Sequence, residues 1–130
     1  PLEFYLSSSG WRIARFDNEM QVREIQAHPQ LLLENDLDNL IVTAPGESDN
    51  TDYVLRVFNP GMGVAEDPAT GIAHMPLAVI WKNLTNTSKF HVEQLSDRHG
   101  KADIEIIDAK QVRISTKAVE VFSTRIALKS

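Results

Sequence analysis

The residue types and spacings that could do chemistry are concentrated in residues 58–74. An adjacent pair of acids, Glu66 and Asp67, precedes the step Thr70-Gly71 and then His74. This segment leads into an apolar stretch that predicts a helix over residues 71–83. The first backbone N–H groups of a helix lack intrahelical partners and carry about half a positive charge. The start of the predicted helix could therefore hold a carboxylate or a phosphate.

The same residues also fit a purely structural interpretation. Asp67 could cap the helix with Pro68 at its first position, or Thr70 could be the cap. Adjacent side chains point apart in regular structure, so Glu66 and Asp67 are not expected to work as a carboxylate pair. Arg56, on the strand that leads to this segment, could pair with one of the two acids or bind an anion.

His74 has two interpretations that the sequence leaves open. Its ordinary pKa near 6.5 would allow acid/base work, but a histidine on an apolar helix is often a buried core residue. The remaining histidines, His28, His91 and His99, are spread over a helix break, a strand and a turn. Their spacing shows no convergence, so no metal site is expected.

The elements that must position this segment follow from hydrophobic patterning. Before it, strands are expected at residues 11–16, 39–43 and 53–58, and a helix through Met20, Val22 and Ile25 with Asp17 or Asn18 as its cap. His28-Pro29 should interrupt that helix, with a further helical turn at Leu31-Leu32-Leu33. After it, strands are expected at residues 90–95, 102–106, 111–115 and 118–122.

The helix predicted over residues 71–83 is apolar on every side, which is typical of an interior helix. We therefore expect an α+β fold with mixed, mainly antiparallel strands wrapped as a barrel-like sheet around one central buried helix. The chain has 130 residues and no repeat or flexible linker, so residues 1–130 should form a single domain.

Composition excludes several classes of function. The net charge of -5 without a basic patch argues against nucleic acid as a partner. No apolar run approaches the roughly 20 residues that span a bilayer, so no membrane partner is expected. The absence of cysteine removes thiol nucleophiles and disulfides. Without a secretory signal pattern, a cytoplasmic location is expected.

A resemblance to a known family adds a function to this pattern. The run that carries it is Glu66-Asp67-Pro68-Ala69-Thr70-Gly71-Ile72-Ala73-His74. It resembles the signature of the PhzF-like family, phenazine-biosynthesis-type isomerases with a diaminopimelate epimerase-like fold. Flanking residues resemble the family as well: residues 41–44, 56–60, 63–64, 77–78, Trp81 and 117–122. The resemblance covers essentially the whole chain, but it matches only the C-terminal lobe of a two-lobed fold.

The resemblance also implies roles for individual residues. Asp67 would contact the substrate and assist proton transfer, and His74 matches the histidine of the motif. The substrate carboxylate would be held by the backbone of Thr70, Gly71, Ile72 and Ala73. The main acid/base of the family is a glutamate of the N-terminal lobe, which no part of this chain matches. The chemistry implied is cofactor-independent.

Two positions depart from the family pattern. Ile72 stands where the family usually has serine, so a hydroxyl that could bind the ligand is lost. Pro76 falls inside the predicted helix, where proline removes a backbone hydrogen bond and predicts a bend.

Three functions follow as expectations. The first is the C-terminal lobe of an isomerase or epimerase that moves a proton on a small carboxylate substrate, with its base supplied by a separate N-terminal lobe or by a homodimer. The alternative is a non-catalytic lobe that binds a small carboxylate or another protein. A third would use Pro1 as a secondary-amine base, against the simpler interpretation of Pro1 as a processing end.

Overall fold

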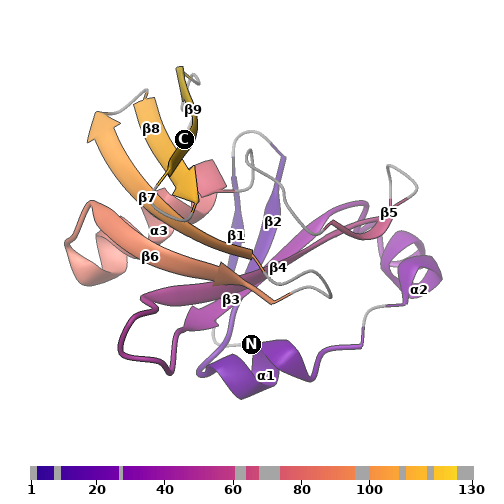
Figure 1. Cartoon of the computed structure of the whole chain (residues 1–130). Coiled ribbons are helices and arrows are strands. Elements are labelled where there is room, and N and C mark those ends of the chain that lie inside the picture. The colour runs from indigo at the N-terminus through magenta and orange to yellow at the C-terminus, as the bar shows by residue number, and fades with distance from the viewer. Residues whose placement is uncertain are drawn as a thin grey trace.

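The computed structural model describes residues 3–7, 10–26, 28–60, 64–67, 74–95, 100–108, 111–116 and 119–125. Nine strands and three helices lie in these ranges (Figure 1). The strands are β1 (Glu3–Leu6), β2 (Arg12–Arg15), β3 (Leu40–Pro45), β4 (Tyr53–Asn59), β5 (Val64–Asp67), β6 (Lys89–Gln94), β7 (Gly100–Asp108), β8 (Gln111–Thr116) and β9 (Val119–Arg125). The helices are α1 (Glu19–Arg23), α2 (Pro29–Glu34) and α3 (His74–Thr85).

All of the strands belong to one mixed sheet, in the order β1-β2-β3-β4-β6-β7-β8-β9 with β5 paired to β4. The β2–β3 and β4–β6 pairs are parallel, and the others are antiparallel. Each parallel pair needs a crossover connection. The first is made through α1 and α2, and the second through α3.

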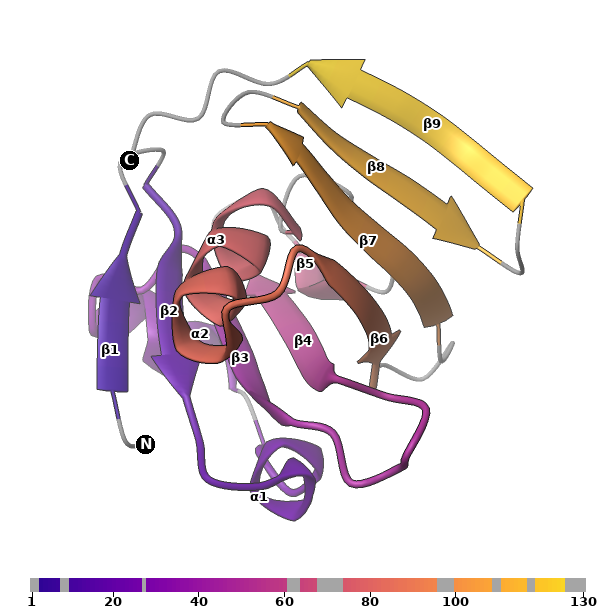
Figure 2. The same ribbon diagram turned by 90° about the vertical axis from the view of Figure 1, so that its left-hand side faces the viewer.

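The expectation of a mixed, mainly antiparallel sheet is confirmed, but the expected barrel-like closure is wrong. Closure requires the first and last strands to pair. Within the described ranges β1 pairs with β2 and β9 with β8, so the sheet stays open. Figure 2 shows the open sheet curving, with α3 on its inner side. Register shifts in the β7–β8 and β8–β9 pairs are the kind of irregularity that increases such curvature.

Alternation along β4 divides the hydrophobic residues between two layers. Tyr53, Leu55 and Val57 belong to a cluster that includes α3, whereas Val54 and Phe58 belong to a second cluster that includes Val22 of α1. Successive side chains of a strand point to opposite faces, so one strand supplies both layers. We call the α3 side of β2, β3 and β4 the inner face and the α1 side the outer face (Figure 1).

The inner layer is the larger of the two. Met75, Leu77, Ala78 and Trp81 of α3 are buried in it. They pack with strand residues Ile13, Ile41, Phe90, Val92, Ile104, Val112 and Ile114. The first turns of α3 are thus buried or half-buried, and exposure begins at Lys82. None of the helices among the described residues is long and apolar enough to span a membrane.

The short helix α1 begins where the sequence predicts. Of the two candidate caps, Asn18 is the N-cap: its side chain accepts a hydrogen bond from the Gln21 backbone N–H at 3.0 Å. The Gln21 side-chain oxygen in turn accepts a hydrogen bond from the Asn18 backbone N–H, which completes a capping box. The helix ends at Arg23, before Ile25 and His28, so it is shorter than predicted. The helical turn at Leu31-Leu32-Leu33 is confirmed, as part of α2.

Two strands are not predicted from the sequence. One is β1, whose four residues are too few to show a clear alternation. The other is β5, which lies inside the segment expected to be a loop. Glycines and prolines on both sides hide it in the sequence. Its strand conformation depends on pairing with β4, which is a tertiary contact.

Candidate active site

The strand β5 brings the acidic end of the motif back onto the sheet. It runs antiparallel to β4, with Asp67 paired to Val57 and Val64 paired to Asn59 across an irregular register. The backbone of Asp67 therefore lies beside the middle of β4 rather than in a free loop. Residues 68–73 lie outside the described residues, and with them the predicted carboxylate-binding positions Thr70, Gly71, Ile72 and Ala73.

Across that segment, the chain resumes at the start of α3. His74 is the first described residue of the helix, and both His74 and Met75 are buried. Because residues 68–73 lie outside the described residues, the expectation that Pro76 falls inside the helix stays a prediction.

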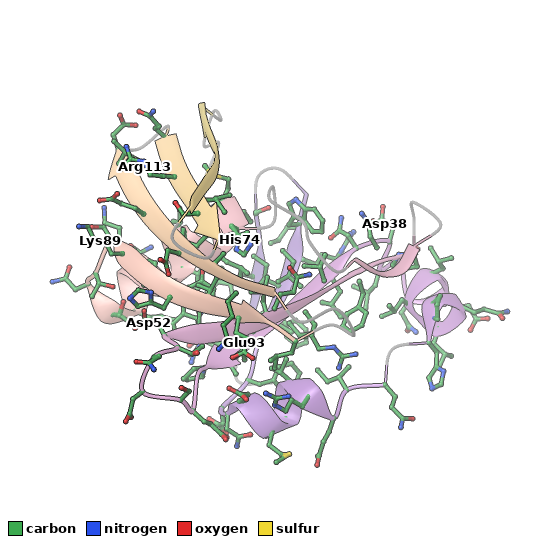
Figure 3. The ribbon with its side chains drawn as sticks, viewed as in Figure 1. Asp38, Asp52, His74, Lys89, Glu93 and Arg113 are labelled. Carbon is green, nitrogen blue, oxygen red and sulfur yellow. The ribbon has the colours of Figure 1, made fainter. Side chains whose placement is uncertain are left out.

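The side chain of His74 is buried. Only 6% of the residue is exposed, and its Nδ1 has no hydrogen-bond partner among the described residues. Burial lowers its pKa from 6.5 to about 4, because the charged imidazolium loses hydration without gaining a partner. Figure 3 shows His74 in the interior, whereas Lys89 and Arg113 lie at the surface. At pH 7 the ring is neutral, so one ring nitrogen can donate a hydrogen bond and the other can accept one.

The far end of α3 is fixed to the inner face by a polar chain. Trp81 Nε1 donates to Thr43 Oγ1 at 3.1 Å, and Thr43 Oγ1 donates to the Val54 carbonyl at 2.7 Å. The Trp81 ring stacks on Tyr53, with centroids 5.3 Å apart and planes within 5°. Tyr53 in turn makes an edge contact with Phe90 at 5.4 Å. These contacts fix the rotation and the depth of α3, and hence the position of His74.

The sequence contains a signal for this anchor that our predictions did not use. His74 and Trp81 are separated by two helical turns, so they share one face of α3. Thr43 carries a hydroxyl in an otherwise apolar strand, and a buried hydroxyl requires a hydrogen-bond partner.

The Tyr53 hydroxyl is buried with no partner among the described residues, and burial raises the pKa of this phenol.

Arg56 has a structural role on the outer face. Its Nη1 donates to the carbonyls of Val22 at 2.9 Å and Ile25 at 2.8 Å, and its guanidinium lies 4.9 Å from the centre of the Phe58 ring. The cation thus binds the C-terminal end of α1, where helix carbonyls are free. The side chains of Glu66 and Asp67 lie outside the described residues, so the pairing of Arg56 with one of these acids, or with an anion, stays a prediction.

The described residues offer no metal centre. Among them, no group of three His, Asp or Glu side chains is arranged to hold an ion. The described residues do offer a strand that ends at Asp67 and a helix whose first described residue, the buried His74, has a lowered pKa.

Solved structures place this architecture in one class, the PhzF-type phenazine biosynthesis proteins. A structure of this class from Clostridium difficile has a TM-score of 0.77 and 31% identity over 97% of this chain and 47% of its own. A PhzF-family structure from Enterococcus faecalis has a TM-score of 0.75 and 31% identity, covering 82% of this chain and 40% of its own.

The sequence profile described as phenazine biosynthesis-like protein matches residues 1–124, and the chain belongs to this family. An uncharacterised isomerase of Halalkalibacterium halodurans is 32% identical over 116 residues, which is 89% of this chain and 43% of that protein. An uncharacterised isomerase of Pseudomonas aeruginosa is 34% identical over 123 residues, 95% of this chain and 46% of that protein. The chain thus spans less than half the length of these relatives.

Proposed function

We propose that the chain is the C-terminal lobe of a PhzF-type isomerase or epimerase, a single domain over residues 1–130. It catalyses cofactor-independent proton transfer at a carbon beside a carboxylate, and a partner lobe supplies the main acid/base. The observation that carries this proposal is the order of the elements along the chain: β5 pairs with β4 and ends at Asp67, and the described part of α3 starts, buried, at His74. The family membership and the isomerase names of the relatives support the reaction class.

In this proposal the substrate carboxylate is held by backbone N–H groups of Thr70, Gly71, Ile72 and Ala73, ahead of α3. The favourable interaction of an anion with a helix N-terminus supports this position. The replacement of the family's serine by Ile72 leaves the backbone donor in place. Pro76 lies in the described part of α3, after the proposed carboxylate-binding residues.

Asp67 and His74 take different parts in the reaction. Asp67 assists the proton shift at the reacting carbon. A pKa of about 4 keeps His74 neutral at pH 7, so it acts by hydrogen bonding through its ring nitrogens rather than as a charged acid. The buried Nδ1 has no partner in the part of the chain that the structure describes, and a ligand or water atom could be its partner.

The test measures proton transfer directly. The chain is combined with the separately produced N-terminal half of the Clostridium difficile protein, and deuterium incorporation from D2O into a panel of small amino and hydroxy carboxylates is followed by proton NMR. Asp67→Asn should slow exchange by roughly 10²–10⁴-fold, the usual contribution of a positioned acid/base. Asp49→Asn, in an exposed loop, is the matched control and should leave the rate unchanged.

Two outcomes would contradict the proposal in different ways. If Asp67→Asn exchanges as fast as the unaltered chain, Asp67 has no part in the proton shift. If a carboxylate binds, by shifts in its own resonances, without any exchange, the non-catalytic carboxylate-binding lobe is the better description.

A further inference from the structure

One hydroxyl group, that of Thr43, joins three elements of the inner layer. Thr43 lies on β3 and is fully buried. Its oxygen accepts the Trp81 Nε1–H of α3 at 3.1 Å and donates to the carbonyl of Val54 on β4 at 2.7 Å. Because both bonds are made inside the protein, the hydroxyl ties the helix to two neighbouring strands at a single point.

The bond from Trp81 to Thr43 restrains α3 in a way that apolar packing does not. Apolar contacts have no preferred direction, whereas a hydrogen bond weakens steeply when its donor and acceptor are misaligned. Stacking on Tyr53 fixes the plane of the Trp81 ring, and the bond to Thr43 fixes its direction within that plane. The hydroxyl therefore limits how far α3 can turn or slide on the sheet.

The helix α3 carries this restraint to His74. Trp81 and His74 are seven residues apart, which is two turns or about 10 Å of helix, and they share one face. Because α3 connects the parallel strands β4 and β6, it runs in the opposite direction to both of them. His74 therefore lies farther along the direction of β4 than Trp81 does.

The strand β4 carries the same restraint to Asp67. Val54 precedes Val57 by three residues, which is about 10 Å of strand. Val57 pairs with the backbone of Asp67 on β5. Both proposed catalytic residues are thus connected to the Thr43 hydroxyl, one through a helix and the other through a strand.

We propose that Thr43 is a positioning residue for the proton transfer: its hydroxyl sets the place of His74 relative to Asp67. This inference rests on the proposed function, in which both residues act on one substrate. Thr43 acts through Trp81 and Val54, since both of its bonds are to these residues and its side chain is buried. A shift of about 1 Å in a reacting group can lower a rate by roughly 10²-fold, so a small movement of α3 is enough.

Three variants separate the hydroxyl from the packing around it. Thr43→Val keeps the branched shape and removes the hydroxyl, whereas Thr43→Ser keeps the hydroxyl and removes a methyl group. Thr85→Val is the matched control, because the Thr85 hydroxyl donates to the Trp81 carbonyl at 2.7 Å, a bond within α3 that does not reach the sheet. Thermal unfolding of each variant sets a temperature at which all of them are folded.

The first measurement follows His74 in the chain alone, by NMR spectra that correlate the nitrogens and protons of the imidazole rings. Thr43→Val should shift the His74 signals, while Thr43→Ser and Thr85→Val should leave them in place. The exposed His28 is the internal reference and should not move in any variant. Unchanged His74 signals in Thr43→Val would overturn the proposal. Equal shifts in Thr43→Val and Thr43→Ser would also overturn it, because packing and not the hydroxyl would then hold the helix.

The second measurement is deuterium exchange into the carboxylate panel, with the N-terminal half of the Clostridium difficile protein present. Thr43→Val should lower kcat by roughly 10- to 100-fold with KM nearly unchanged, as expected for a misplaced reacting group. Thr43→Ser and Thr85→Val should exchange as fast as the unaltered chain. A normal kcat for Thr43→Val would overturn the role of Thr43 and leave the proposed function in place. If the unaltered chain gives no exchange, the proposed function fails, and the role of Thr43 fails with it.

Discussion

The inner and outer faces of the sheet are built from alternate residues of the same strands, yet they treat buried polar groups differently. On the outer face Arg56 donates to the carbonyls that end α1, and Glu19 pairs with Arg23 at 2.7 Å. On the inner face the Tyr53 hydroxyl and His74 Nδ1 are buried without partners among the described residues. Polar contacts attach a helix to each face, but the inner face also holds buried hydrogen-bonding groups that have no partner among the described residues.

This difference indicates where function resides. An unsatisfied buried polar atom costs about 1–3 kcal/mol, so a fold keeps one only where something compensates. On the inner face the apolar packing of α3 supplies that compensation. The comparison makes the inner face the candidate site and the outer face its support, and four substitutions can break or sharpen that division.

The largest effect is expected at Trp81, which anchors α3 to the inner face. Trp81→Ala should lower the free energy of unfolding by about 3–5 kcal/mol, because it removes a buried ring, its stacking on Tyr53 and its bond to Thr43. Denaturant unfolding measures the change. Leu84→Ala, on the exposed end of the same helix, should cost below about 1 kcal/mol. Equal costs at the two positions would refute the anchor.

The second effect is a pH dependence that belongs to the inner face. His74 has a pKa of about 4 when folded against 6.5 when unfolded, so the unfolded chain binds the proton more tightly. Stability is therefore fully present above pH 6.5 and falls by about 3 kcal/mol as the pH drops towards 4. Unfolding measured from pH 7 to pH 4 should show a smaller decline for His74→Gln.

The control for that measurement is His28→Gln, since His28 is exposed at the start of α2 and its side chain makes no capping bond. This variant should decline in parallel with the unaltered chain. A decline for His74→Gln that is as steep as that of His28→Gln would contradict the burial of an uncharged imidazole.

A smaller effect is expected on the outer face at Arg56. Arg56→Met keeps much of the side-chain length but leaves the carbonyls of Val22 and Ile25 without their donor, at a cost of about 2 kcal/mol. Thermal unfolding measures it. Arg12→Met, which breaks only the exposed pair with Asp38, should cost less than about 1 kcal/mol. If Arg56→Met loses proton exchange while its stability is unchanged, Arg56 acts in the active site rather than as a support for α1.

The smallest effect is expected at the cap of α1. Asn18→Ala should cost about 1 kcal/mol, because the Gln21 backbone N–H loses its acceptor. Asp17→Ala, one residue earlier, should stay within about 0.5 kcal/mol. Circular dichroism during thermal unfolding distinguishes the two. A larger loss of stability for Asp17→Ala than for Asn18→Ala would show that Asp17, and not Asn18, is the cap.

Much of the fold could be predicted from the sequence because its signals are local. Three signals each depend on neighbours only a few residues away: the alternation around Ile13 and Leu55, the cap at Asn18, and the apolar run of α3. The strand β5 could not be predicted in this way, since it is a strand only through its pairing with β4. The open sheet was missed for the same reason, because closure depends on strands at opposite ends of the chain.

The site divides along the same line. The sequence by itself determined the motif at residues 66–74, the absence of thiol chemistry and the likeness to one family. Only the tertiary structure decided that Arg56 donates to the carbonyls at the end of α1 and that His74 is buried with a lowered pKa. Residue types and spacing fix which groups are available. Burial and the partners within hydrogen-bonding distance fix their charge and use, and these arise only when distant segments pack together.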